Sequence, residues 1–412
     1  MRLRGVTGPA GRRWRMTAVV AAAGVLLSAG CSGGDKSGTP SWQSGAEAAA
    51  ANAPAPASPQ PTLSTVAVTF PAKDATGVKA IAEIKYSSED PANTAVEVKD
   101  AAGKKVEGTL DTDEKVFRPA EALGWGKKYT VTVTGTASAD RGATATSSFT
   151  VMKKPSKLVR AVSHLGDGQT VGVGMPLIIR LDRAVPKKYR ADVQRRMQVT
   201  ATPAQEGIWH WTSGQEVHYR PKVYWKPQTK VSYRVQLKGV PMGDGWYGRT
   251  DYTVNVKIGR SFVMTVDNKS KHMIVKQNGK VVKKLPVSLG KPGFHTVSGT
   301  MLVTDKLRKT TFNTIGRFTG PDAYNTEVEY AQRLTWGGQF IHAARWSEGS
   351  QGRTNVSHGC INVSHGGGKW LYENTMIGDP VTITGTEERI QYGDGWTDWS
   401  LSWEEYKKGS AI

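Results

Sequence analysis

The sequence predicts a mainly β protein built from two tandem β-sandwiches, a third β-rich domain and a short tryptophan-rich tail. Its 412 residues exceed what one hydrophobic core usually fills, which is about 250 residues, so several domains are expected. Short stretches of alternating apolar residues separated by turn residues indicate strands. Part of this pattern returns after roughly one hundred residues, which is the size of an immunoglobulin-like domain.

The N-terminus has the pattern of an export signal. A basic stretch precedes an apolar run over 16–27, which is too short to span a bilayer. Residues 27–31 (Leu-Ser-Ala-Gly-Cys) resemble a bacterial lipobox. We therefore expect a signal peptide over 1–30 and a lipidated Cys31 that anchors the mature chain to the extracytoplasmic face of the cell membrane. An ordinary cleavage site beside a chance cysteine is the alternative.

The charge balance is strongly basic. Lys and Arg number 55 against 35 Asp and Glu, which gives a net charge of +20, and such a surface attracts polyanions. Export argues against nucleic acid as the partner. A run of basic residues between 153 and 196 would suit anionic polymers of the cell wall, and a solvated basic surface is the equal alternative.

The sequence contains two cysteines, Cys31 and Cys360. If Cys31 carries lipid, no disulfide is possible. A single free thiol in an exported protein is kept for reactivity more often than for packing. The alternative for Cys360 is the role of a small buried apolar residue.

The segment 31–64 is rich in Gly, Ser, Ala and Pro without apolar periodicity, so we expect a flexible tether. Two immunoglobulin-like sandwiches follow, over 65–152 (domain A) and 155–259 (domain B). Their repeat is visible in the sequence, because 217–221 resembles 116–119. We expect both domains to act as spacers.

Domain B contains two histidines, His210 and His218, among aromatic residues. They are predicted to be packed side chains rather than metal ligands. The loop 240–245 contains one carboxylate, so we expect no metal there either.

The third domain is placed at 260–386. Apolar stretches on both sides of Asn278-Gly279 predict a β-hairpin, because this dipeptide favours a two-residue turn. The glycine-containing segment 291–301 is predicted to form a mobile lid.

A tail over 387–412 ends the chain. Its tryptophans are spaced by three and then four residues, which predicts one face of a helix. We expect this tail to pack on the third domain. The three tryptophans are Trp396, Trp399 and Trp403.

The candidate chemistry gathers around Cys360. A thiol needs a base to become a nucleophile, and the imidazoles of His342 and His358 are available in the same stretch. Gly359 precedes the thiol, and glycine lets the backbone approach a substrate and direct N–H groups at an oxyanion. The residues therefore predict acyl transfer through a thioester.

The pattern resembles the signature of the L,D-transpeptidase catalytic domain of the YkuD type. That signature is a histidine, about fifteen residues, Ser/Thr-His-Gly-Cys, an apolar residue and Asn. Here His342 is followed by Ser-His-Gly-Cys-Ile-Asn at 357–362. The resemblance covers roughly 260–385, and the whole chain is similar to actinobacterial lipoproteins of that family with two N-terminal immunoglobulin-like domains.

The resemblance implies a role for each motif residue. Cys360 is the nucleophile, and His342 moves the protons while the carbonyl of Ala343 orients its ring. Backbone N–H groups of His358, Gly359 and Cys360 are expected to form the oxyanion hole, and the His358 ring is expected to fix the loop. No metal or other cofactor is implied. The expected substrate-binding residues are Tyr324, Gly337, Gly338, Ser357 and Asn362.

The implied function is an L,D-transpeptidase that forms 3→3 cross-links in peptidoglycan. The donor is a tetrapeptide stem that loses its terminal D-alanine, and a second stem is the acceptor. Carbapenems are expected to acylate the same thiol.

Three alternatives stay open at this point. With water as acceptor the same site is an L,D-carboxypeptidase, and with other acceptors it anchors proteins to the wall. A non-catalytic wall scaffold would leave the complete motif unexplained. A metal site made of His342, His358, Cys360 and His365 fits no familiar zinc spacing.

Overall fold

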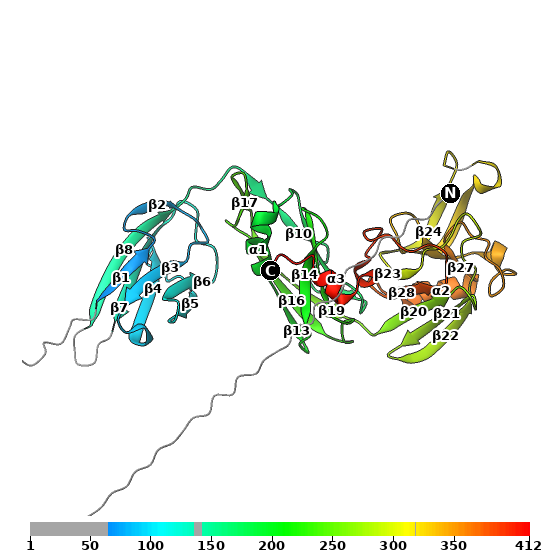
Figure 1. The fold of residues 1–412 in the computed structure, drawn as a ribbon, viewed down its shortest axis with the longest axis horizontal. Helices are drawn as coiled ribbons and strands as arrows, with labels where there is room; N and C mark the ends of the chain where they lie inside the picture. The colour runs from blue at the N-terminus through cyan, green and yellow to red at the C-terminus, as the bar shows by residue number, and fades with distance from the viewer. Residues whose placement is uncertain (1–64, 136–141, 318) are drawn as a thin grey trace, which may run out of the picture. The chain divides into compact units, whose positions relative to one another are not determined.

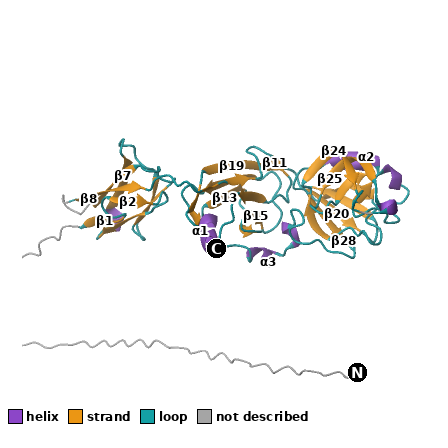
Figure 2. Cartoon of the chain, turned by 90° about the horizontal axis from the view of Figure 1, so that it is seen from above, coloured by secondary structure: helices purple, strands orange, loops and turns teal. Residues whose placement is uncertain are grey.

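The computed structural model describes residues 65–135, 142–317 and 319–412. Within these ranges the fold is mainly β, as the sequence predicts, and helices are few and short (Figures 1 and 2). The predicted signal peptide, lipidation site and tether fall outside the described residues. In the described ranges, no helix is long and apolar enough to cross a bilayer.

Domain A is a sandwich of two four-stranded sheets, with strand orders β1-β3-β6-β5 and β2-β8-β7-β4. Ile84, Val131 and Phe149 face the space between the sheets and are at most 1% exposed. The 3-10 turn η1 spans Pro91–Asn93. The strands are β1 (Val66–Phe70), β2 (Ala75–Val78), β3 (Ile84–Ser88), β4 (Thr94–Asp100), β5 (Gly108–Asp111), β6 (Val116–Pro119), β7 (Lys128–Gly135) and β8 (Ala143–Val151).

Domain B has the same design. Its sheets run β10-β12-β15-β14 and β11-β19-β16-β13, and a small third sheet runs β17-β18-β9. The elements are β9 (Leu158–Val159), β10 (Ala161–Ser163), β11 (Thr170–Val171), β12 (Leu177–Leu181), α1 (Lys187–Arg195), β13 (Met197–Thr202), β14 (Gly207–Trp211), β15 (Glu216–Pro221), β16 (Lys230–Gln236), β17 (Pro241–Gly243), β18 (Trp246–Gly248) and β19 (Asp251–Ile258).

The repeat predicted from the sequence is confirmed by the strand orders. The similar stretches form β6 and β15, and each is the third strand of its sheet. In the other sheet, β2 pairs in parallel with β8 and β11 pairs in parallel with β19. The two sandwiches therefore share the strand order of their two main sheets, and domain B adds α1 and a small third sheet.

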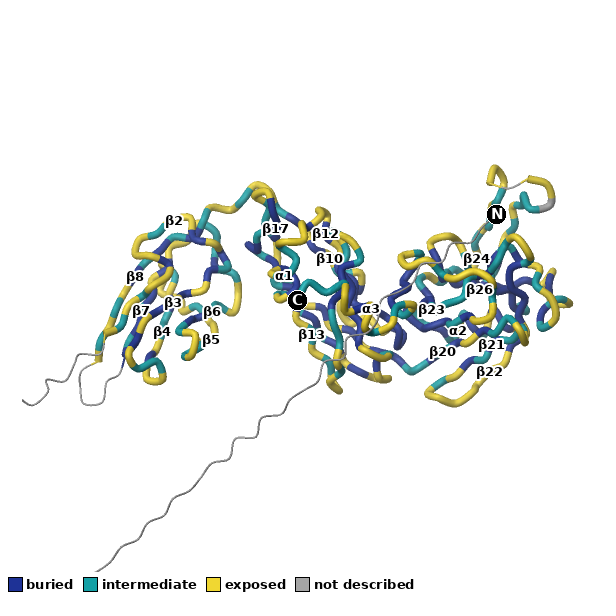
Figure 3. Tube along the Cα trace, viewed as in Figure 1, coloured by how far each residue is buried: buried dark blue, intermediate teal, exposed yellow. Residues whose placement is uncertain are grey.

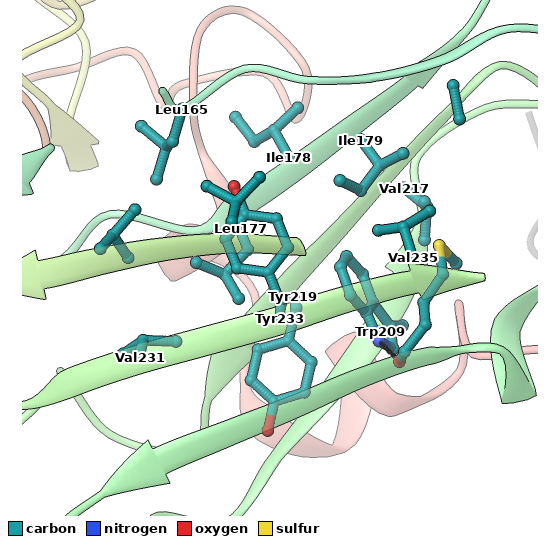
Figure 4. Close-up of a cluster of buried hydrophobic side chains, with 14 of the residues drawn as sticks. Leu165, Leu177, Ile178, Ile179, Trp209, Val217, Tyr219, Val231, Tyr233 and Val235 are labelled. Atoms are coloured by element: carbon teal, nitrogen blue, oxygen red, sulfur yellow. Dashed lines mark hydrogen bonds between the residues drawn. The ribbon is translucent and has the colours of Figure 1, made fainter. Parts of the chain in front are cut away.

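Strand alternation builds the core of domain B. Val231, Tyr233 and Val235 on β16 point inward and are at most 1% exposed (Figure 4). Ile179 on β12 and Val217 on β15 meet them from the facing sheet (Figure 4). Because successive side chains of a strand alternate, the residues between them point to solvent.

The catalytic domain contains a five-stranded sheet, β22-β21-β20-β28-β23, and a four-stranded sheet, β24-β25-β26-β27. The predicted hairpin is confirmed: Asn278 and Gly279 have positive φ angles of 49° and 82° and join β21 to β22. Figure 3 shows β22 as an exposed edge over most of its length. The elements are β20 (Phe262–Asp267), β21 (His272–Gln277), β22 (Lys280–Pro286), β23 (Gly299–Leu302), β24 (Asp305–Asn313), η2 (Gly320–Asp322), β25 (Asn325–Arg333), β26 (Phe340–Ala343), η3 (Arg345–Ser347), β27 (Ile361–Val363), α2 (His365–Asn374) and β28 (Pro380–Thr384).

Helix α2 packs closely on β26. The Ser364 hydroxyl caps its first turn by accepting the N–H of Gly367 at 3.1 Å. A Cβ on Gly368 would stand 3.0 Å from the Ala343 side chain and 3.1 Å from its backbone. Glycine is therefore used here for close contact, although it is a poor helix former. The contact supports the strand that carries His342.

The prediction for the tail is wrong about the helix and incomplete about the packing. The three tryptophans do not share a helix: Trp396 precedes the 3-10 turn η4 (Asp398–Ser400), Trp399 lies within it, and Trp403 begins α3 (Trp403–Lys407). The tail does bind the catalytic domain, where Ile390 N–H donates to Ser298 O at 2.9 Å and the Ser400 hydroxyl donates to Thr300 O at 3.0 Å.

The second part of the tail also packs on domain B. Trp396 is 2% exposed within the domain B core, and the Trp399 indole N–H donates to Gly174 O at 2.6 Å. The guanidinium of Arg220, itself 2% exposed, lies 4.2 Å from the Tyr406 ring centroid and 4.4 Å from that of Trp399. Buried aromatic surface and a cation–π cluster favour this position over the catalytic domain.

A buried ion pair connects the tail to the sandwich. His218 Nδ1 lies 2.9 Å from Asp398 Oδ1, and His218 Nε2 lies 2.8 Å from Glu216 Oε1. Burial alone would lower the pKa of His218, but Asp398 and Glu216 raise it to about 9. His210 stacks on Tyr406 with ring centroids 4.5 Å apart. Both histidines are packed, as predicted, and His218 is an ionic contact as well.

Because of this pair, we expect the protein to become less stable as the pH rises into the alkaline range. The folded pKa of His218 exceeds the usual value of 6.5, so its contribution is complete below about 6.5 and is lost as pH rises through about 9. We expect the melting temperature to fall between about pH 7 and 10. Asp398→Asn should destabilise the protein at pH 7 by about 1–3 kcal/mol, because it removes one of the two carboxylates paired with the buried His218 and leaves Glu216 as the other.

Thermal melts across this pH range test the expectation. Glu404→Gln is the matched control, because Glu404 pairs with Lys407 at 2.7 Å on the exposed side of α3 and such pairs contribute at most about 1 kcal/mol. An Asp398→Asn protein that melts like the wild type at pH 7 would contradict the ionic role of His218.

Candidate active site

The parallel pairing of β26 and β27 brings the predicted catalytic residues together. His342 on β26 is in register with Asn362 on β27. Cys360 precedes Asn362 by two residues, so strand alternation places it on the same face of the sheet as His342. The nucleophile strand is supported on its other side by Ser288, which exchanges backbone hydrogen bonds of 2.9 and 3.0 Å with Asn362.

A cavity of about 250 Å³ opens on this face. It contains most of the predicted site and is walled by aromatic and aliphatic side chains. Its lining residues are Phe312, Tyr324, Thr326, Val328, His342, Trp346, Val356, Ser357, His358, Cys360 and Asn362.

His342 has a defined tautomer. It is 3% exposed, and its Nδ1 donates a hydrogen bond to the Ala343 carbonyl at 2.9 Å, as expected. Nε2 is therefore the basic nitrogen. Burial lowers the pKa of His342 to about 4, and the bond to Ala343 offsets only part of this effect.

Cys360 is an unpaired thiol that is partly exposed. Its sulfur lies 3.8 Å from the Gly338 carbonyl, a weak hydrogen bond. Burial of the sulfur raises the pKa of Cys360 to about 11, and the backbone N–H of Phe340 acts in the opposite direction. At neutral pH the thiol thus retains its proton while the imidazole of His342 is neutral and can accept one.

The loop before β27 is shaped by one glycine and one hydroxyl. Gly359 has a φ of +114°, which other residues rarely adopt. Ser357 accepts the Gly359 N–H at 3.1 Å and donates to the Cys360 carbonyl at 2.7 Å. Ser357 thus uses the Gly359 N–H here, and the expected place of this donor in the oxyanion hole stays a prediction.

His358 connects the nucleophile loop to a second loop. Its Nε2 lies 2.7 Å from Asp322 Oδ1 on η2, and the same oxygen accepts from Lys291 Nζ at 2.5 Å. The ring also contacts Phe294 and Tyr324, with centroids 4.6 and 5.0 Å away. These contacts fit the expected loop-fixing role of His358, and Asp322 is the partner that the sequence did not reveal.

The expected substrate-binding residues divide into two groups. Tyr324, Ser357 and Asn362 line the cavity. Gly337 and Gly338 are exposed and do not line it. The Gly337 N–H is bound by Asp394 of the tail at 2.6 Å, whereas Gly338 contacts the thiol through its carbonyl.

The prediction of a lid at 291–301 is wrong. Within this segment, Thr296 is 1% exposed and donates to the Gly359 carbonyl at 2.9 Å, so the segment supports the nucleophile loop. The walls of the cavity come instead from the β24–β25 hairpin, through Phe312, Tyr324 and Val328. Hairpin residues far from the motif could not be assigned to the cavity without the strand register.

Sequence reasoning also missed Trp346. It follows His342 by four residues, lines the cavity and is 62% exposed. Its ring stacks on His342 with centroids 5.9 Å apart and an interplanar angle of 30°. An exposed tryptophan close to a catalytic histidine was the available signal.

The described residues contain no group of three or more His, Cys, Asp and Glu side chains placed to bind a metal ion. Among the four residues of the metal alternative, His365 contacts Glu329 at 3.1 Å and His358 contacts Asp322. The arrangement provides a thiol, an imidazole that can accept a proton and a pocket, and acyl transfer requires groups of this kind.

Comparisons with known proteins match both parts of the chain. Residues 75–241 match the bacterial Ig domain, and residues 261–383 match the L,D-transpeptidase catalytic domain. L,D-transpeptidase 2 of Mycobacterium tuberculosis (strain CDC 1551 / Oshkosh) is 33% identical over 342 residues, 82% of this chain and 83% of that protein.

L,D-transpeptidase 5 of M. tuberculosis (strain ATCC 25618 / H37Rv) is 33% identical over 353 residues, 83% of this chain and 76% of that protein. A solved L,D-transpeptidase in complex with imipenem is 30% identical and covers 56% of this chain and 100% of its own, with a TM-score of 0.48.

The chain thus joins immunoglobulin-like domains to a catalytic domain of the transpeptidase class. It belongs to the L,D-transpeptidase family.

The resting state of the thiol can be tested by its reactivity. Because burial raises the pKa of Cys360 to about 11, the rate of alkylation by iodoacetamide should rise about tenfold per pH unit from pH 6 to 10. His342→Gln should show the same profile, because a neutral imidazole does not stabilise a thiolate. Mass spectrometry of the Cys360 peptide measures the rate, and a plateau near pH 7 would contradict the neutral pair.

The role of Asp322 can be tested by turnover. Asp322→Asn keeps the shape but weakens the charge-assisted bond to His358, so the nucleophile loop should lose its position. We expect kcat to fall roughly tenfold with a smaller change in KM. Glu327→Gln is the control, because Glu327 forms an exposed pair with Lys309 on the same hairpin. Equal kcat values for both variants would exclude Asp322 as a positioning residue.

Proposed function

We propose that this enzyme forms 3→3 cross-links in peptidoglycan through a thioester on Cys360. The observation that carries the proposal is the tautomer of His342: its Nδ1 donates to Ala343, so Nε2 is free to act as the base. Cys360 lines the same cavity. A thiol beside a correctly oriented imidazole is the arrangement that acyl transfer requires.

In the first half-reaction, Sγ of Cys360 attacks the carbonyl carbon of the third stem residue while its proton passes to Nε2 of His342. The tetrahedral intermediate collapses, the C–N bond to the terminal D-alanine breaks, and His342 returns the proton to the leaving amine. A thioester remains on Cys360. The low pKa of His342 favours this return, because the imidazolium is a strong acid.

In the second half-reaction, the side-chain amine of an acceptor stem attacks the thioester. His342 takes the proton from this amine, the new amide bond forms, and the proton returns to the sulfur as the thiol leaves. The energy comes from the peptide bond of the donor, so no ATP is consumed.

The oxyanion of each intermediate needs backbone donors. Since Ser357 uses the Gly359 N–H, we assign the hole to the N–H groups of His358 and Cys360. Such donors contribute about 3–4 kcal/mol each.

Asn362 is our candidate for binding the donor stem. It lines the cavity and is 2% exposed. Its Nδ2 donates a hydrogen bond to the Ser347 hydroxyl at 3.1 Å. Its Oδ1 has no hydrogen-bond partner among the described residues. A buried acceptor without a partner is costly, and a stem amide N–H would satisfy it.

The same thiol should be acylated by carbapenems, whose strained lactam carbonyl replaces the stem carbonyl. We also propose that a diacylglycerol on Cys31 anchors the chain to the outer face of the membrane and that the tether and sandwiches place the catalytic domain in the wall. Metabolic labelling with a palmitate analogue, lost in Cys31→Ala, tests the anchor.

Mass spectrometry of residues 65–412 with a disaccharide-tetrapeptide tests the reaction. We expect a cross-linked dimer that lacks one D-alanine, and a lactam-sized mass increase on the Cys360 peptide after carbapenem treatment. Cys360→Ala should abolish both.

The products also separate the alternatives. A tripeptide without dimer would identify a carboxypeptidase. No product and no adduct on Cys360 would overturn the proposal and favour a scaffold.

A further inference from the structure

A hollow on the outer face of domain B is the feature that the catalytic function does not explain. It lies on the sheet formed by β13, β16 and β19 and has a volume of about 360 Å³. Val231 and Tyr233 of β16 point into the core (Figure 4). Lys230 and Ser232 therefore point to the opposite face, toward the hollow.

The strand register arranges polar side chains in two rows across this hollow. One row pairs Lys230 with its neighbours on both adjacent strands, and the second pairs Ser232 in the same way. The first row is Thr202–Lys230–Lys257, and the second is Thr200–Ser232–Asn255.

Two like charges stand directly opposite each other in the first row. Lys230 and Lys257 are cross-strand partners, and both are exposed. No carboxylate of the described residues lies within 4.0 Å of either ammonium group, as it would in an ion pair. Asp167, on the loop beside β19, accepts from the backbone and side chain of Asn255 at 2.7 and 3.1 Å. Opposed like charges destabilise a sheet, so this pair needs a different explanation.

The hydroxyl groups that line the hollow are also available to bind a ligand. Thr200, Thr202 and Ser232 make no side-chain hydrogen bonds to other described residues. Some basic residues elsewhere in domain B are engaged: Arg190 lies over Trp211, 5.0 Å from its ring centroid, and Arg195 pairs with Asp192 at 3.0 Å. Free ammonium groups and free hydroxyls thus converge on one concave site.

We propose that this hollow binds a phosphodiester-linked sugar or polyol unit of an anionic wall polymer. Two opposed ammonium groups match one phosphate, since lysine binds phosphate as a point charge. The three hydroxyls and Asn255 match the hydroxyl groups beside it. The volume falls in the range of ligand sites, about 300–1,000 Å³, and exceeds what a bare phosphate fills.

This binding does not use the thiol chemistry, but it assumes the proposed location outside the cytoplasm. It changes the expected role of domain B from spacer to wall-binding module. A bound polymer would retain the catalytic domain near its substrate and raise the effective concentration of acceptor stems.

Binding of a poly(glycerol phosphate) to the full-length chain in mild detergent tests the proposal. Lys230→Gln/Lys257→Gln should weaken binding at least about tenfold and reduce the slope of log K against log salt by roughly one to two. The matched control is Lys280→Gln/Lys284→Gln, which removes the same charge from the exposed strand β22; it should change affinity less than about threefold.

Two further measurements complete the test. Without polymer, Lys230→Gln/Lys257→Gln should melt no lower than the wild type, because it removes a repulsion. Lys230→Arg/Lys257→Arg should retain binding. If both Gln double variants lose the same affinity for the polymer, general charge attraction explains the binding and the site is overturned. If the wild type binds polyglutamate as tightly as poly(glycerol phosphate), the phosphodiester assignment is overturned. Absence of wild-type binding at about 0.1 M salt, a concentration that screens general attraction, would overturn the site itself.

Discussion

The site depends on the parallel pairing of two short strands, β26 and β27. This pairing places His342 and Cys360 on one face although seventeen residues separate them in the chain. Every other feature of the site acts on these two strands: Gly368 lets α2 approach β26, Ser288 supports β27, and Ser357 fixes the loop between them. A small shift in their register would separate the base from the thiol, because side chains alternate along a strand.

Burial gives this pair its chemical character. Burial disfavours both the thiolate and the imidazolium, so the pKa of Cys360 rises and that of His342 falls. The pair rests neutral, and charge develops only when an acyl substrate enters and the proton moves. Such a thiol is protected from indiscriminate reaction until a substrate enters the pocket.

The tail connects domain B to the catalytic domain, because it packs on both. It begins on the catalytic domain, supplies Asp394 to Gly337 beside the site, and ends around Arg220 and His218 of domain B. The two domains are also joined by a direct backbone hydrogen bond: the Gly172 N–H of domain B donates to the Ile377 carbonyl of the catalytic domain at 2.8 Å. The turn that precedes the strand of His342 is thereby connected, through the bond from Gly337 to Asp394, to the sandwich that bears the proposed polymer site.

The sequence by itself determined the features that local patterns encode. The motif from His342 to Asn362, the Asn278-Gly279 hairpin and the repeat of the two sandwiches could all be predicted, because turn chemistry, strand periodicity and motif spacing are properties of neighbouring residues. The tertiary structure decided what depends on distant residues. His358 meets Asp322 across 36 positions and His218 meets Asp398 across 180. The use of the Gly359 N–H by Ser357 became visible only with the conformation of the folded loop, in which Gly359 has a φ of +114°. Contacts of this kind follow from how strands pair and sheets pack, which no local pattern specifies.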